Sequence, residues 1–212
     1  MKKVAWLIAV MVFVSWVAGG AAQAAPVTSF VVPSLVDELN NALNGNAGDV
    51  SANGGTVTVV ENGAGPYRQS IITLASVPVV VVGASGIGFG GVKVYDFPQG
   101  HIWVEKVVAD DLVSTEGSGI SGGAGGDYGI GTVIVAGTSL SSTYVDLGPS
   151  TSADPITNAV DVTLSAAVGF DGSATAKDAN LNMLIDDADI AGTCTNLVSG
   201  TITITWTFLG DD

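Results

Sequence analysis

The period at which apolar residues recur changes once along the chain. Between residues 34 and 45 it is helical, because Leu35, Leu39 and Leu43 fall on one face of a helix, and the segment starts with a sequence close to a capping box. This pattern predicts one short N-terminal helix. From residue 56 onward apolar and polar residues alternate with a period of two, which indicates β-strands with one buried face.

The C-terminal segment shows this alternation most clearly. Its apolar set is Ile202, Ile204, Trp206 and Phe208, and its polar set is Thr201, Thr203, Thr205 and Thr207. Successive side chains of a strand point to opposite faces, so we expect a core-facing side and a threonine side open to solvent or a partner strand. Residues 79–82 are all valine, which predicts a central strand that is apolar on both faces.

Glycine and proline separate the remaining strand patterns at short intervals. Further strands are expected near 69–75, 91–97, 101–109, 130–136, 142–147, 160–164 and 180–186. About nine or ten short strands with such turns predict an all-β fold, a β-sandwich or jelly-roll-like domain. The glycine-rich stretch 117–126 is expected to be the most mobile loop.

Three regions follow from these patterns: a signal-peptide-like segment at 1–24, a helix or arm with a linker at 25–55, and a single β-sandwich domain at 56–212. The first region carries Lys2 and Lys3, then an apolar run, then an A-x-A cleavage site ending at Ala24. The apolar run is shorter than the ~20 residues that span a bilayer. We therefore expect a secreted protein cleaved near Ala24 that makes no membrane contact after processing; an uncleaved anchor is the alternative.

Charge is strongly one-sided. Twenty acidic residues and six basic ones give a net charge of −14, and loss of Lys2 and Lys3 on cleavage would change it to −16. Such a surface repels phosphate backbones and anionic lipids, so nucleic acid is not an expected partner. The ordinary role of this acidity is to keep an apolar β-protein in solution.

Few residues suggest chemistry. The glycines from Gly86 to Gly91 precede a strand pattern rather than a helix, which argues against a dinucleotide loop. His101 is the single histidine and opens an apolar strand, where a structural role is the ordinary one. Cys194 is the single cysteine, so an intramolecular disulfide is excluded, and we expect either a small partly buried residue or an intermolecular bridge. No catalytic or cofactor-binding residue is assigned, and no enzymatic activity is expected.

Asp186, Asp187 and Asp189 form the one candidate metal site. Clustered carboxylates in a loop are the ligands that Ca²⁺ takes. The spacing does not match an EF-hand loop, which also needs a glycine at its sixth position and a glutamate at its twelfth. These aspartates either bind a structural Ca²⁺ or form a solvated acidic loop, and a solvated loop is the more common case.

Three stretches resemble structural proteins of tailed-bacteriophage virions, a family associated with the phage head. They are GGVKVYDFPQGHIWVEKVVADDLV from Gly90, FDGSATAKDANLNMLIDDADI from Phe170 and GTITITWTFLGD from Gly200. The resemblance extends over about residues 66–212. It implies a β-sandwich or jelly-roll that occurs in many copies per particle as a capsid or head-decoration component, located in the virion.

The export-type segment 1–24 departs from this family, because phage heads assemble in the cytoplasm. Two functions therefore stay open: a non-enzymatic virion component, or a secreted or cell-surface bacterial β-protein that self-associates or adheres. Both imply a homo-oligomer that also contacts other virion or surface proteins. The expected interface is the arm at 27–45 or the C-terminal strand, whose residues from Thr201 to Leu209 carry no charge.

Overall fold

A computed structural model gives the structure of the chain. It describes residues 46–47, 55–84, 87–116, 119–120, 125–153, 160–164, 168–186, 190 and 192–210. The chain divides into two compact units, residues 1–36 and 37–212, and all the described residues belong to the second. The expected signal-like segment 1–24 and the helix expected within 34–45 lie outside the described residues.

The described part is almost entirely β-structure, which confirms the all-β prediction. Eleven strands join in one sheet, and every pairing is antiparallel. The strands are β1 (Asn46–Ala47), β2 (Thr56–Ala64), β3 (Tyr67–Ala84), β4 (Ile87–Asp96), β5 (His101–Glu116), β6 (Gly125–Gly131), β7 (Gly148–Ala153), β8 (Val160–Leu164), β9 (Val168–Asp171), β10 (Asp178–Asp186) and β11 (Thr193–Gly210). A 3-10 turn, η2, covers Ser142–Tyr144.

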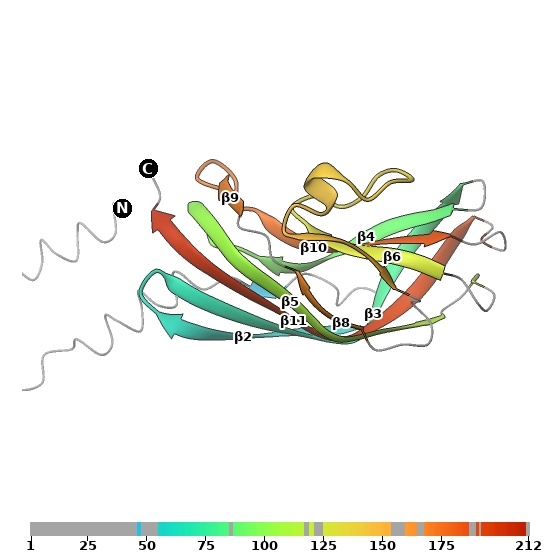
Figure 1. Ribbon diagram of the computed structural model, residues 1–212, viewed down its shortest axis with the longest axis horizontal. Coiled ribbons are helices and arrows are strands. Elements are labelled where there is room, and N and C mark those ends of the chain that lie inside the picture. Colours follow the sequence, from blue (N-terminus) through green and yellow to red (C-terminus); the bar gives the residue numbers. More distant parts are fainter. Residues whose placement is uncertain are drawn as a thin grey trace, which may run out of the picture. The chain divides into compact units, whose positions relative to one another are not determined.

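The sheet curls over itself. Its strand order is β7-β6-β10-β4-β3-β11-β5-β8, with β2 beside β3, β9 beside β5 and β1 beside β4. In β3, residues 67–75 pair with β2 and residues 82–84 pair with β4, so this long strand belongs to both halves of the sheet. Figure 1 shows the result: β4, β10 and β6 lie above β2, β5 and β11.

The core lies between these two halves. Trp206 of β11 is fully buried and meets Phe97, which follows β4, edge-to-face at a ring-centroid distance of 5.6 Å. Phe97 also packs edge-to-face on Tyr95 at 4.9 Å. Ile202 and Ile204 are completely buried, so the predicted core face of the C-terminal strand is confirmed for these two residues and Trp206; Phe208 is half-buried.

The prediction for residues 79–82 is wrong in one respect. Val79 and Val81 are completely buried, but Val80 and Val82 are exposed. β3 is indeed an interior strand of the sheet, yet only one of its faces is covered here. A run of four valines carries no polar position that would reveal which face is open.

The strands predicted at 130–136 and 142–147 are also wrong. Only the last residues of β6 belong to the first, and the second is the η2 turn with the bends after it. The physical reason is that side chains satisfy the backbone here. Asp146 accepts the amide proton of Thr132 at 2.8 Å, and Asn182 accepts that of Val135 at 2.9 Å, so neither amide needs a neighbouring strand.

Glycines allow β4 to approach its neighbours closely. A Cβ on Gly90 would lie 2.0 Å from the carbonyl oxygen of Val80. A Cβ on Gly91 would lie 2.2 Å from Oδ1 of Asn182. These two glycines therefore serve packing within the sheet.

Candidate functional site

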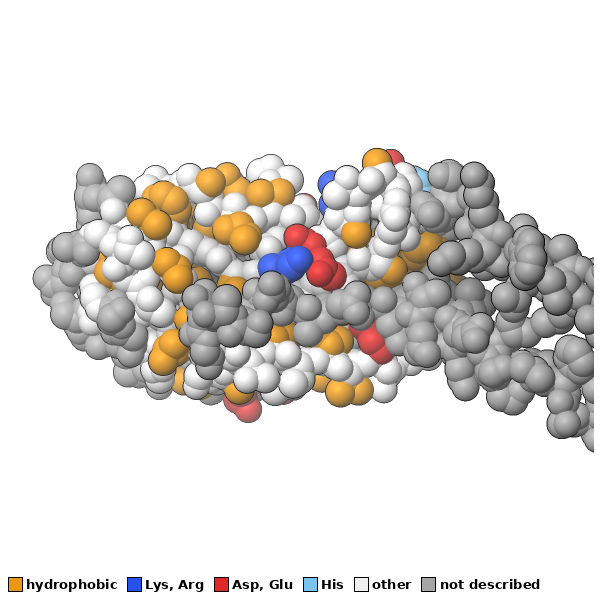
Figure 2. Space-filling model, turned by 180° about the vertical axis from the view of Figure 1, so that it is seen from behind, with side chains coloured by type: hydrophobic (Ala, Val, Ile, Leu, Met, Phe, Trp, Pro, Cys, Tyr) orange, Lys and Arg blue, Asp and Glu red, His pale blue; other side chains and the backbone are white. Residues whose placement is uncertain are grey.

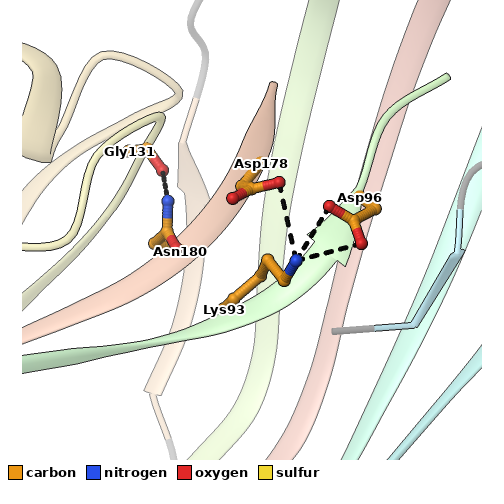
Figure 3. Close-up of polar contacts among 5 residues, drawn as sticks. All are labelled: Lys93, Asp96, Gly131, Asp178 and Asn180. Atoms are coloured by element: carbon orange, nitrogen blue, oxygen red, sulfur yellow. Dashed lines mark hydrogen bonds and ion pairs between the residues drawn. The ribbon is translucent and has the colours of Figure 1, made fainter. Parts of the chain in front are cut away.

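An ion-pair cluster joins the ends of β4 and β10. The strand register sets Asp96 opposite Asp178, and Lys93 reaches both carboxylates from β4 (Figure 3). Its Nζ lies 3.1 Å from both carboxylate oxygens of Asp96 and 3.9 Å from Oδ1 of Asp178. All three side chains are about one-third exposed.

The two carboxyl groups titrate differently. Burial raises the pKa of Asp178 to about 6, and the hydrogen bond and negative charge of Asp96 act in the same direction. Burial would also raise the pKa of Asp96, but hydrogen bonds from Asp178 and Lys93, with the Lys93 charge, lower it below its ordinary value. The pair can thus share one proton in mildly acidic solution, with Asp178 as the donor. Lys93 and Asp96 both belong to β4, and the ion pair of Lys93 with Asp178 links this strand to β10, which is a structural role.

A second polar cluster lies inside the curl of the sheet. Ser70 accepts a hydrogen bond from Nε1 of Trp206 at 2.8 Å and donates one to Oε2 of Glu61 at 3.0 Å. The Tyr95 hydroxyl donates to Oε1 of Glu61 at 2.7 Å. Because β2, β3, β4 and β11 each contribute one residue, the cluster fixes the two halves of the sheet relative to each other.

His101 opens β5, as expected, and lies beside the turn after β9. Its Nε2 is 3.8 Å from Oδ1 of Asp171. Ser173 donates its hydroxyl and its amide to the same oxygen at 2.6 and 2.9 Å, and these two bonds lower the pKa of Asp171. A nucleophilic serine would donate to the imidazole, whereas this hydroxyl donates to the carboxylate. The arrangement is an Asx turn closed by serine rather than a catalytic triad.

The candidate Ca²⁺ ligands are not brought together in the described part. Asp186 is described only as the last residue of β10, and Asp187 and Asp189 lie outside the described residues. Elsewhere among those residues, no three histidine, cysteine or acidic side chains gather as metal ligands do. Cys194 is completely buried in β11 and bonds through Sγ to the carbonyl oxygen of Gly119 at 2.9 Å, so it is not exposed for an intermolecular bridge.

The connection between β6 and β7 is held onto the sheet by asparagines that sequence analysis did not single out. Asn182 is completely buried and donates through Nδ2 to the carbonyls of Val133 and Tyr144 at 2.9 and 2.8 Å. Its Oδ1 accepts the Val135 amide. Asn180 donates to the carbonyl of Gly131 at 3.2 Å. The sequence feature that indicated these buried asparagines is the alternation of asparagine with leucine and methionine in β10.

The outer face formed by β2, β3, β11 and β5 exposes apolar side chains between threonines. Tyr67, Thr207 and Trp103 form one cross-strand row, and Tyr67 is 65% exposed. The Trp103 ring lies over Gly169 of β9, where a Cβ would be 2.8 Å from the ring. Val60 of β2 is 57% exposed. Exposed aromatic and aliphatic residues of this kind are typical of protein-contact surfaces.

The reverse view of the molecule is also poor in charge. Figure 2 shows hydrophobic and uncharged side chains over most of the described surface, with basic and acidic side chains adjoining in one place.

No known protein-family model matches the chain, and no curated protein matches its sequence. The three stretches from which a resemblance to virion proteins was expected fall in β4 and β5, in β9 and β10, and in β11. Within the described residues, no helix has the length and apolar character needed to cross a membrane.

Proposed function

We propose that this chain is a non-enzymatic structural protein that assembles in multiple copies, as a capsid or head-decoration component of a tailed-phage virion. One observation carries the proposal. The outer face of the sheet exposes large apolar side chains, among them Val60, Tyr67 and Trp103, on a surface that is uncharged along β2, β3 and β11. Its charged residues Glu105, Lys106 and Asp110 belong to β5. A surface of this composition is suited to contact with protein rather than with nucleic acid.

The internal polar clusters support the same proposal. The clusters use their polar contacts to connect strands or to hold a loop: Lys93 through its ion pair with Asp178, Ser70 with Trp206, and Asn182 with the β6–β7 connection. A protein that must keep one shape while packed among many copies benefits from such cross-links. The resemblance of three of its segments to head-associated proteins adds the virion as the assembly.

The alternative is a secreted or cell-surface bacterial β-protein that self-associates or adheres. Its supporting observation is the segment 1–24, with two lysines, an apolar run and an A-x-A site. Both functions use the same exposed face, and they differ in where the assembly forms. We infer for both a sandwich-like or jelly-roll-like domain, in which the two halves of the curled sheet serve as the two layers.

Mass spectrometry of purified particles tests the choice between them. If the proposal is correct, virions isolated from the source contain this chain in many copies per portal complex, with residues 1–24 present or removed during maturation. A chain recovered instead from the extracellular or envelope fraction, beginning at Ala25 and absent from particles, would overturn the virion assignment and support the alternative.

A further inference from the structure

β2 is the longest strand that has a single hydrogen-bonded neighbour in the described part of the chain. It pairs with β3 at all nine positions, from Thr56 opposite Ala75 to Ala64 opposite Tyr67, with no register shift. The other strands with one described neighbour, β1, β7, β8 and β9, have two to six residues. β11 is bonded on both sides, so the C-terminal strand has no open edge to offer a partner. Figure 1 shows β2 at the rim of the sheet.

This edge has few of the features that usually prevent strand pairing. Edge strands are normally protected by lysine, proline, bulges, short length or an inward-pointing charge, and of these β2 has only the inward-pointing charge. Its exposed side chains on the outer face are Thr56, Thr58, Val60 and Asn62. Its one charged residue, Glu61, is turned inward, where Ser70 and Tyr95 bond to both carboxylate oxygens.

We infer that β2 pairs antiparallel with β2 of a second copy of this chain, across a two-fold axis at Val60; this rests on the proposed function. Val60 is the central residue of the strand, so the axis sets it against Val60 of the second copy. The same register sets Thr58 opposite Asn62 and Thr56 opposite Ala64. Every outer-face pair is uncharged, and the central one joins two exposed valines.

The charge of the chain limits where a second copy of itself can bind. A net charge of −14 makes two copies repel wherever acidic surfaces meet, so self-contact is restricted to uncharged surface. The uncharged row continues inward from the edge: Val60 pairs with Ile71, Ile71 with Thr203, and Thr203 with Val108. Pairing at β2 would extend this row across eight strands of a continuous sheet.

The test compares two lysine variants of the full chain by sedimentation velocity. Val60→Lys sets two ammonium groups against each other at the axis, so we expect the dissociation constant to rise by about tenfold or more. Thr73→Lys adds the same charge at an exposed position of the same face on β3, one strand in from the edge, and should associate as the wild type does. Both variants lower the net negative charge equally, so general repulsion cannot explain a difference.

A cysteine at the axis gives a second measurement that does not depend on how Val60→Lys folds. Val60→Cys should form a covalent dimer on mild oxidation, while Thr73→Cys should not, and the native Cys194 is buried. Wild-type assembly with undiminished association of Val60→Lys, and with no cross-link in Val60→Cys, would overturn the β2 pairing and leave the proposed function standing. A wild type that never associates would overturn both.

Discussion

Trp206 is the residue on which the two halves of the sheet converge. Its ring meets Phe97, which follows β4, and its Nε1 donates to Ser70 of β3, so one buried side chain serves both packing and the polar cluster. Its burial could be predicted from the period-two alternation of the C-terminal segment, because that pattern is local. The partner Ser70 could not, because it depends on the pairing of β3 with β11.

Replacement of Trp206 tests this role. Trp206→Ala should lower the free energy of unfolding by about 3–5 kcal/mol, the usual cost of a large-to-small aromatic change in a core. Thr205→Val, one residue away on the opposite and half-exposed face, should change it by less than about 1 kcal/mol. Denaturant midpoints measure both values, and equal losses would contradict the assignment of the two faces.

Asp178 predicts a dependence of stability on pH. Its pKa is about 6 in the folded chain and about 3.9 in an unfolded one, so between these values the native state binds more protons. The free energy of unfolding contributed by this carboxyl therefore falls as pH rises from about 4 to about 6 and stays low above that. Asp178→Asn should raise Tm by about 2 °C near pH 7.5, since partial exposure limits the effect to roughly 1 kcal/mol.

Calorimetry at several pH values tests the direction of this Tm difference. The gain in Asp178→Asn should shrink toward zero as pH falls to about 3, where the wild-type carboxyl is mostly protonated in both states. Asp96→Asn is the companion variant: it removes the neighbouring carboxylate, so a carboxyl NMR titration should find the pKa of Asp178 closer to its ordinary value. A Tm difference that is independent of pH argues against the shared proton.

At the scale of the element, the β6–β7 connection shows where sequence periodicity fails. Its apolar residues alternate well enough to predict strands, but their backbone groups bond to side chains of a distant strand, β10. The Lys93 cluster escaped prediction for the same reason, because Asp96 and Asp178 meet only through the register of β4 with β10. The carboxylates singled out instead, Asp186, Asp187 and Asp189, are neighbours in sequence, and Asp187 and Asp189 lie outside the described residues.

Asn182 should control the order of this connection. Asn182→Ala leaves the Val135 amide and two carbonyls without their partner, so we expect a cost of about 2–4 kcal/mol and faster hydrogen exchange at Val135. Asn180→Ala, in the same strand, removes one such bond and should cost about 1 kcal/mol. Unchanged exchange at Val135 in Asn182→Ala would show that the connection is held by other contacts.

At the scale of the whole molecule, the chain combines a strong negative charge with a sheet whose outer face is largely uncharged. The negative charge was evident from composition. The strand alternation predicted the uncharged outer face in part. The curl of the sheet, and the identity of its edges, were not predictable, because they depend on which strands pair. That is why the C-terminal strand was a natural candidate for an interface by sequence, whereas the structure sets it between β3 and β5.

Sedimentation velocity of the wild-type chain at low and moderate salt tests self-assembly most directly. Screening shortens from about 30 Å at 0.01 M to about 8 Å at 0.15 M ionic strength, so repulsion between acidic copies weakens as salt is added. We expect species of several times 21.1 kDa, or of the corresponding cleaved mass, at the higher salt and a shift toward the monomer at the lower. A single monomeric species at both salt concentrations and tens of micromolar protein would contradict self-assembly.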